Sequence, residues 1–158
     1  MGYYKTAQIC KKGHVVTPNI NYKPPLQHCP HCGSVTYTEC PFCGASIRGA
    51  FVRQGVSTDY TAYKPDFYCC ECGKAFPWTI YFLERTDSIL ALDADLSLEY
   101  KDLIRNAIPD LVTESPTVFA AAADYSVGIE KASDIVKSAL NNLLITIACE
   151  SAKTFLFG

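Results

Sequence analysis

The segment Cys29-Pro-His-Cys-Gly33 is followed, after residues 34–39, by a second copy of the same motif, Cys40-Pro-Phe-Cys-Gly44. Two thiolates three positions apart can hold one metal ion, and the glycine that follows permits the tight turn that aims backbone N–H groups at the sulfurs. A third copy, Cys69-Cys-Glu-Cys-Gly73, follows later, and a shorter variant, Cys10-Lys-Lys-Gly-His14, precedes them. Four half-sites of this kind predict two tetrahedral metal centres.

Counting the ligands gives two complete sets of four. The expected zinc ligands are Cys10, His14, Cys29, Cys32, Cys40, Cys43, Cys69 and Cys72. His14 completes the first set because Gly13 can bend the chain so that the imidazole replaces the second thiolate, with His28 or His31 as the alternative ligand. Cys70 and Cys149 fall outside this pattern, and we expect them to be spare, partly buried thiols.

The pairing of the half-sites has two solutions. In sequential pairing, the first two half-sites hold one ion and the last two hold the other, which is the zinc-ribbon arrangement of two knuckles at the tips of hairpins. In cross-braced pairing, the half-sites alternate. The short link 33–39 suits a single strand between two stacked ribbons and favours sequential pairing. Both sites would be closed by four protein ligands, so we expect two structural Zn²⁺ ions per chain, on which residues 1–78 depend to fold.

Composition bears on compartment and partners. Nine Cys in 158 residues indicate either disulfides or metal ligation. No signal peptide opens the sequence and no apolar run reaches membrane-spanning length, so we expect a cytoplasmic protein with reduced, metal-bound thiols. Residues 1–78 hold eight Lys/Arg against four Asp/Glu, and residues 79–158 hold six against twelve. Seven metal-bound thiolates would cancel most of the basic excess, which weighs against nucleic acid as the main ligand.

The composition changes near Trp78, where Cys, Gly and aromatic residues give way to Ala, Leu, Ile and acids. The sequence therefore predicts an α+β protein: tandem zinc ribbons of short β-hairpins at 1–78, and a helical domain of about four helices at 79–158. The predicted strands are Thr6–Ile9, Val15–Thr17, Val35–Glu39, Ile47–Val52 and Tyr63–Tyr68.

Helix boundaries follow from caps and breakers. The first helix is expected from about Pro77 to Ala94, and the second from a Ser97 cap to Ile108, before Pro109. Ser115-Pro116 is typical of the start of a third helix, and Gly128 is expected to break the pattern before a long last helix. The last helix carries a wide apolar stripe, either buried within its own bundle or available for self-association or a protein partner.

Several motifs together carry a resemblance. They are Tyr4-x-x-Ala-Gln-Ile-Cys10-x-x-Gly-His14, the Cys-x-x-Cys-Gly and Cys-Pro-x-Cys knuckles, Ile47-Arg-Gly49, Tyr68-Cys-x-x-Cys-Gly-Lys74 and Pro77-Trp-Thr79. The chain resembles an uncharacterised bacterial family, a domain of unknown function with zinc-ribbon-like cysteines and a helical tail. The likeness covers residues 3–79 and is looser beyond, and it implies a small bacterial cytosolic protein but no activity.

No catalytic constellation stands out, so the sequence predicts no enzyme. We expect a zinc-binding protein-interaction or assembly module. The alternative is weak binding of single-stranded nucleic acid through the region of Arg48, Arg53, Tyr60 and Tyr63. A zinc enzyme would require one of the metal sites to be open.

Overall fold

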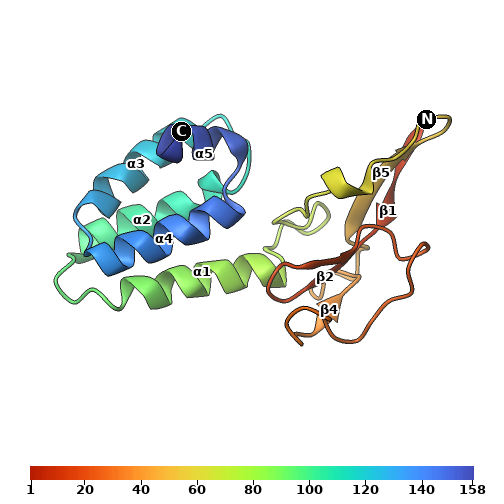
Figure 1. Ribbon diagram of the computed structural model, residues 1–158, viewed down its shortest axis with the longest axis horizontal. Helices are drawn as coiled ribbons and strands as arrows, with labels where there is room; N and C mark the ends of the chain where they lie inside the picture. Colours follow the sequence, from red (N-terminus) through yellow and green to blue (C-terminus); the bar gives the residue numbers. More distant parts are fainter. The chain divides into compact units, whose positions relative to one another are not determined.

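The computed structural model describes residues 1–158 and has the predicted α+β class: five short strands in two antiparallel sheets, followed by five α-helices (Figure 1). The chain divides into two compact units, residues 1–82 and residues 83–158. We call them the ribbon unit and the helical unit. The sequence placed a boundary after residue 78; the structural division falls within the first helix, α1 (Pro77–Leu90).

The ribbon unit contains both sheets. In one sheet β1 (Gly2–Thr6) pairs antiparallel with β5 (Arg48–Arg53). In the other, β2 (Gln8–Cys10) lies between β3 (Val15–Thr17) and β4 (Thr36–Tyr37). The strands are short, and between them the chain forms turns around the cysteines that are closed by their own backbone hydrogen bonds.

One predicted strand is not formed. The range Tyr63–Tyr68 contributes only an isolated bridge between Tyr68 and Ala75, and a 3₁₀ helix, Tyr60–Ala62, precedes it. Pro65 has no N–H to donate to a ladder, which is the physical reason that aromatic content alone misled the prediction.

The core of the ribbon unit is small and built around aromatic rings. Trp78 is fully buried, and its indole stacks on Phe76 with ring centroids 4.5 Å apart. Its Nε1 donates a hydrogen bond to the backbone carbonyl of Asp66 at 2.9 Å, which satisfies the one polar atom of the ring. Ile9 and Ile47 complete the apolar centre, together with two of the cysteines.

The helical unit has more helices than the sequence indicated. After α1 come α2 (Leu98–Leu111), α3 (Val118–Glu130), α4 (Asp134–Ile147) and α5 (Glu150–Phe157). The expected long last helix is therefore two helices. The break is at Ala148 and Cys149, which both have extended backbone, and the Cys149 N–H donates to the carbonyl of Leu111 at 2.8 Å instead of continuing a helix.

The caps and breakers were predicted with mixed success. Ser97 caps α2 as predicted, its hydroxyl accepting the N–H of Tyr100. Ser133 caps α4 in the same way and was missed. Pro109 lies inside the last turn of α2, where a proline removes one hydrogen bond without ending the helix. The start at Ser115-Pro116 was wrong, because α3 begins at Val118.

Gly128 does not break α3 as predicted; it allows α2 and α3 to approach. A Cβ at this position would lie 2.7 Å from Cγ1 of Ile104 and 3.0 Å from the carbonyl oxygen of Tyr100. The glycine is therefore explained by close packing between two helices and not by a local turn.

Much of the apolar stripe that the sequence predicted for the last helix is buried, although Ile135 is exposed. Val136, Leu140 and Leu144 of α4 are fully inaccessible to solvent. These three side chains belong to the core of the helical unit and are not available to a partner.

Candidate metal centres

The three Cys-x-x-Cys-Gly knuckles have one backbone geometry. In each, the glycine N–H donates to the carbonyl of the first Cys at 2.8 Å, and the N–H of that Cys donates to the carbonyl five residues later. The three glycines, Gly33, Gly44 and Gly73, have φ between 72° and 78°. This left-handed conformation is one that L side chains rarely adopt, so glycine closes each turn.

The half-site at Cys10 is the same turn shortened by one residue. Gly13, with φ 94°, donates to the carbonyl of Cys10 at 2.9 Å, and the Cys10 N–H donates to the carbonyl of His14 at 3.0 Å. The glycine now occupies the position of the second Cys, and the ligand moves one place along. An imidazole is longer than a thiol side chain, which suits a donor at this more distant position.

The first group brings together Cys10, His14, Cys29 and Cys32, whose donor atoms all lie within 4.8 Å of one another. Nδ1 of His14 lies 3.5 Å from Sγ of Cys10 and 3.7 Å from Sγ of Cys29. The Sγ atoms of Cys10 and Cys32 are 3.8 Å apart. His31 contacts the His14 ring, with centroids 5.6 Å apart, but is not a member of the group.

The second group brings together Cys40, Cys43, Cys69 and Cys72 within the same limit of 4.8 Å. The Sγ atoms of Cys40 and Cys72 are 3.8 Å apart, and those of Cys43 and Cys69 are 3.7 Å apart. Cys40 and Cys69 are buried, whereas Cys43 and Cys72 are exposed. Each group thus joins consecutive half-sites, and each can hold one metal ion.

The thiols of each group differ in pKa because their hydrogen bonds and their burial differ. Hydrogen bonds from Ser34 lower the pKa of Cys32 to about 6. Burial raises the pKa of Cys10 to about 11, since the thiolate loses its hydration there.

The second group divides in the same way. The backbone N–H groups of Cys72 and Glu71 lower the pKa of Cys69 to about 7. The Ala45 N–H favours the thiolate of Cys43, but loss of hydration at the sulfur and the hydrogen bonds shared with its neighbouring thiols outweigh it. Together they raise the pKa of Cys43 to about 12, although the residue as a whole is exposed. A divalent ion held by the four sulfurs would favour the thiolate form of all of them.

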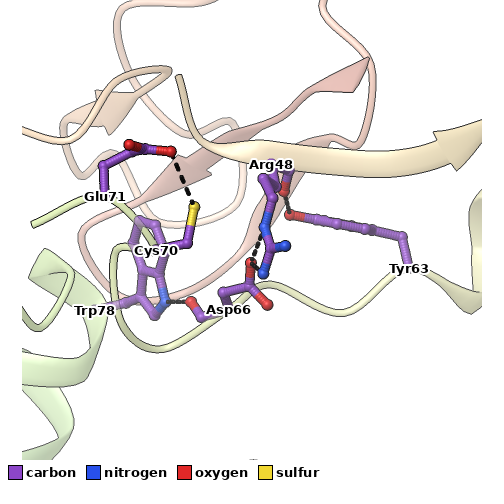
Figure 2. A network of polar contacts seen from close by, with 6 residues as sticks. All are labelled: Arg48, Tyr63, Asp66, Cys70, Glu71 and Trp78. Atoms are coloured by element: carbon purple, nitrogen blue, oxygen red, sulfur yellow. Dashed lines mark hydrogen bonds and ion pairs between the residues drawn. The ribbon is translucent and has the colours of Figure 1, made fainter. Parts of the chain in front are cut away.

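Cys70 lies beside the second group but takes part in other contacts (Figure 2). Its exposed thiol donates a weak hydrogen bond to Glu71 at 4.0 Å. Next to it the guanidinium of Arg48 pairs with the Asp66 carboxylate at 3.0 Å. Cys149 lies at the start of α5, outside both groups, and burial raises the pKa of its thiol.

Three of the four residues expected to contact nucleic acid make contacts with other parts of the ribbon unit. Arg48 is engaged by Asp66, and the Tyr63 hydroxyl donates to the carbonyl of Arg48 at 2.6 Å (Figure 2). Burial raises the pKa of Tyr63, consistent with an internal role. Tyr60 stacks on Tyr22 with centroids 6.2 Å apart. Of the four, Arg53 remains exposed without a carboxylate partner.

Sequence reasoning missed another exposed set of aromatic residues. Tyr3, Tyr4 and Phe51, on β1 and β5, have side chains between 43% and 55% exposed, and a cation lies over each ring. The alternation of Tyr and Lys in residues 3–5 and of Phe and Arg in residues 51–53 was the available signal.

The fold and these sites define a small α+β protein with two Cys-rich groups suited to metal binding. The chain belongs to the family described as "Uncharacterized protein conserved in bacteria (DUF2321)", whose profile matches residues 3–156. The match therefore includes both units, which extends the resemblance seen in residues 3–79. No curated protein and no solved structure matched the chain. None of the five helices has the length and apolar character needed to cross a membrane.

Proposed function

We propose that each group binds one Zn²⁺ ion and that the two ions hold the ribbon unit in its fold. The supporting observation is the spacing of the donors. Zinc lies about 2.3 Å from thiolate sulfur in tetrahedral sites, which places two sulfurs about 3.8 Å apart. The observed sulfur pairs are separated by 3.7 to 3.8 Å. Thiolate and imidazole are also the donors that zinc prefers.

Both ions would be structural. Each group supplies four protein donors, so a tetrahedral ion would keep no position for water or substrate. We therefore infer a protein without catalytic zinc and, because no nucleophile, base and orienting residue converge elsewhere, a non-enzymatic one.

The test is metal content by native mass spectrometry. The wild-type chain is expected to carry two zinc ions, and Cys43→Ser is expected to reduce this to one. Cys70→Ser is the matched control, because it removes an exposed thiol next to the same group and should leave two ions bound. Equal loss from both variants, or a wild-type chain that takes up no zinc, would contradict the proposal.

We further propose that the chain is an interaction module whose partner docks on the helical unit. The exposed apolar side chains of α3 and α5 are the candidate docking surface: Phe119 is 58% exposed, Val127 52% and Phe155 49%. The rings of Phe119 and Phe155 are in contact, with centroids 6.0 Å apart. They form one aromatic patch across two helices.

The charge near this patch indicates the chemistry of the partner. Residues 106–130 contain four acids and no Lys, Arg or His. Two of the acids, Asp124 and Glu130, are exposed on α3 itself. A protein segment that presents an apolar face flanked by Lys or Arg fits this surface, as in the docking of amphipathic helices. Pairing with a second copy would bring like charges together.

A titration can test this docking. The probe is a labelled amphipathic Leu/Lys peptide, compared with a Leu/Glu peptide of equal hydrophobicity. We expect the basic peptide to bind and Phe119→Asp to weaken it about tenfold, whereas Leu92→Asp, at another exposed apolar residue, leaves it unchanged. Equal binding of both peptides would contradict the proposal, and so would a stable dimer that Phe119→Asp dissociates.

Binding of single-stranded nucleic acid is a second candidate function. The residues that the sequence suggested for it are mostly engaged internally. The observation that favours it is instead the row of exposed rings with cations on β1 and β5.

A further inference from the structure

One side of the two-stranded β1–β5 sheet carries a row of two aromatic rings with a cation at each end. The register pairs Gly2 with Arg53 and Tyr4 with Phe51, and paired residues point to the same side of a sheet. Arg48 reaches the same row, since its guanidinium lies 4.7 Å from the centroid of the Tyr4 ring. We call Arg48, Tyr4, Phe51 and Arg53 the aromatic ladder.

The contacts along the ladder are continuous. The Tyr4 and Phe51 rings have centroids 4.9 Å apart, and the Arg53 guanidinium lies 5.7 Å from the Phe51 ring. The Phe51 ring lies against Gly2, where any side chain would collide with it, because a Cβ there would be 2.2 Å from the ring. The missing side chain therefore leaves room for the ring, and the ladder is held in place by backbone as well as by neighbouring rings.

Cation–π pairs are concentrated in the ribbon unit. Four such pairs involve exposed rings within residues 1–82, whereas proteins in general show about one for every 70–80 residues. Rings that only filled a thin core would be buried. Here Tyr4 is 51% exposed and Phe51 43%, so the rings of the ladder are accessible to a ligand.

The charge of the ladder is positive. Neither β1 nor β5 contains an acid. Asp66 neutralises Arg48, but Arg53 is exposed and has no carboxylate partner. The ribbon unit with two Zn²⁺ ions would be nearly neutral as a whole, but it still has a local cationic surface beside the two rings.

A hollow of about 290 Å³ begins where the ladder ends. Phe51 and Arg53 form part of its wall, together with the hydroxyl-bearing residues Ser57 and Thr58. The carboxylate that lines it, Asp59, is already engaged by the backbone N–H and the hydroxyl of Thr61. The hollow therefore offers polar groups beside the end of the ladder at Arg53.

We propose that the aromatic ladder binds single-stranded nucleic acid, with bases stacked against Tyr4 and Phe51 and phosphates held by Arg53 and the exposed part of Arg48. Accessible rings beside guanidinium groups are how proteins bind single strands without reading sequence. A duplex keeps its base faces stacked, so the ladder would favour a single strand. This inference names the site for the second candidate function and rests on it; it is independent of the helical unit.

The opposite side of the same sheet provides matched controls. Tyr3 and Lys5 alternate with the ladder residues, and Lys5 lies 4.7 Å over the Tyr3 ring. Tyr3 is 55% exposed, about as much as Tyr4. Substitutions at Tyr3 and Tyr4 should therefore disturb the β1–β5 sheet to a similar extent, but they alter opposite faces of it.

The experiment measures fluorescence anisotropy of labelled oligo-dT and oligo-U of about 12 nucleotides against the zinc-loaded full chain. With about two phosphates contacted, log K should fall with log salt with a slope of about −1.4, shallow for a nucleic-acid-binding protein. Tyr4→Ala and Arg53→Glu should each weaken binding at least about fivefold, whereas Tyr3→Ala and Lys5→Glu should not. Arg85→Glu, a charge reversal at an exposed residue of the helical unit, should also have no effect.

The outcomes separate the site from the function. No binding of either oligonucleotide in 50 mM salt would overturn both the inference and the second candidate function. Binding that Tyr3→Ala weakens as much as Tyr4→Ala would keep the function and overturn the ladder. If Arg85→Glu weakens binding as much as Arg53→Glu, or if a poly-Glu peptide binds as tightly as the oligonucleotides, the chain attracts anions in general. Either result would overturn base stacking on the ladder. None of these results bears on zinc content or on the Leu/Lys peptide.

Discussion

The ribbon unit and the helical unit are similar in length but owe their order to different physical sources. The helical unit buries a conventional apolar core, in which α4 supplies three fully inaccessible side chains. The ribbon unit has five short strands and a core partly made of cysteines. A defined fold therefore does not require long regular elements: in the ribbon unit, turns closed by backbone hydrogen bonds bring together donors that could hold metal ions, whereas the helical unit relies on packed helices.

Removal of metal should produce the largest difference between the units. Structural zinc contributes roughly 10–16 kcal/mol in small zinc-dependent folds, which is comparable to or larger than the whole stability of an ordinary domain. A strong chelator should therefore unfold the ribbon unit and leave most of the helix signal in far-UV circular dichroism. Trp78, the single Trp and fully buried in the ribbon core, provides the second readout, because its emission should shift to the red. Unchanged Trp78 emission after complete loss of zinc would contradict the proposal that metal maintains the fold of the ribbon unit.

A cavity in the helical core should have the converse effect. Leu140→Ala removes a fully buried side chain of α4 and should lower the free energy of unfolding of the helical unit by about 2–5 kcal/mol. Zinc content should remain at its wild-type value. Ile135→Ala is the matched control on the same helix, since Ile135 is 74% exposed, and it should change stability by no more than about 0.5 kcal/mol. Urea unfolding followed by circular dichroism measures both, and loss of zinc from Leu140→Ala would argue that the two units are coupled.

The smallest of the three effects should depend on pH. The Asp93 carboxylate accepts the backbone N–H groups of Ser133, Leu96 and Asp95, and these bonds lower its pKa below the ordinary value of 3.8. A lowered pKa means that the unfolded chain binds the proton first, so the stabilisation is present above pH 3.8 and is lost as the pH falls through the folded value.

Asp93→Asn should therefore destabilise the helical unit at pH 7, less than Leu140→Ala does, and the difference from wild type should shrink below about pH 4. Unfolding midpoints between pH 3 and 7 measure this, with Asp95→Asn at an exposed neighbour as the control. A constant difference across that range would mean that the amide disturbs packing and that charge plays no part.

The two units were also unequally predictable from sequence. The knuckles specify their own geometry, because a Cys, a second donor and a left-handed glycine must follow each other at fixed spacing. The structure then brings the donors of consecutive half-sites together. The fold class followed from the same pattern combined with the 3.6-residue periodicity of the second half. These signals are local, so they can be recognised in a single sequence.

The remaining features depend on neighbours in space. Gly128 looked like a helix breaker, but its role depends on Ile104 of another helix. The break at Cys149 follows from a hydrogen bond to Leu111, 38 residues earlier in the chain, which no periodicity encodes. The aromatic ladder was missed because Tyr4 and Phe51 become neighbours only through the pairing of β1 with β5. The ion pair of Arg48 with Asp66 was not foreseen for the same reason, since Asp66 comes from another segment.

The closed turns around the cysteines also bear on how the two proposed Zn²⁺ ions would be taken up. Each turn is fixed by its own backbone hydrogen bonds, so two donors are already positioned before the other half of a site arrives. An ion can then be captured by one turn and completed by closing the intervening loop, which has 14 residues between His14 and Cys29 and 25 between Cys43 and Cys69. Loop entropy grows slowly with length, and this difference amounts to about 0.5 kcal/mol. Loop length therefore gives neither site a clear advantage when metal is scarce. The two sites would be loaded by two parallel routes and not in one obligatory order.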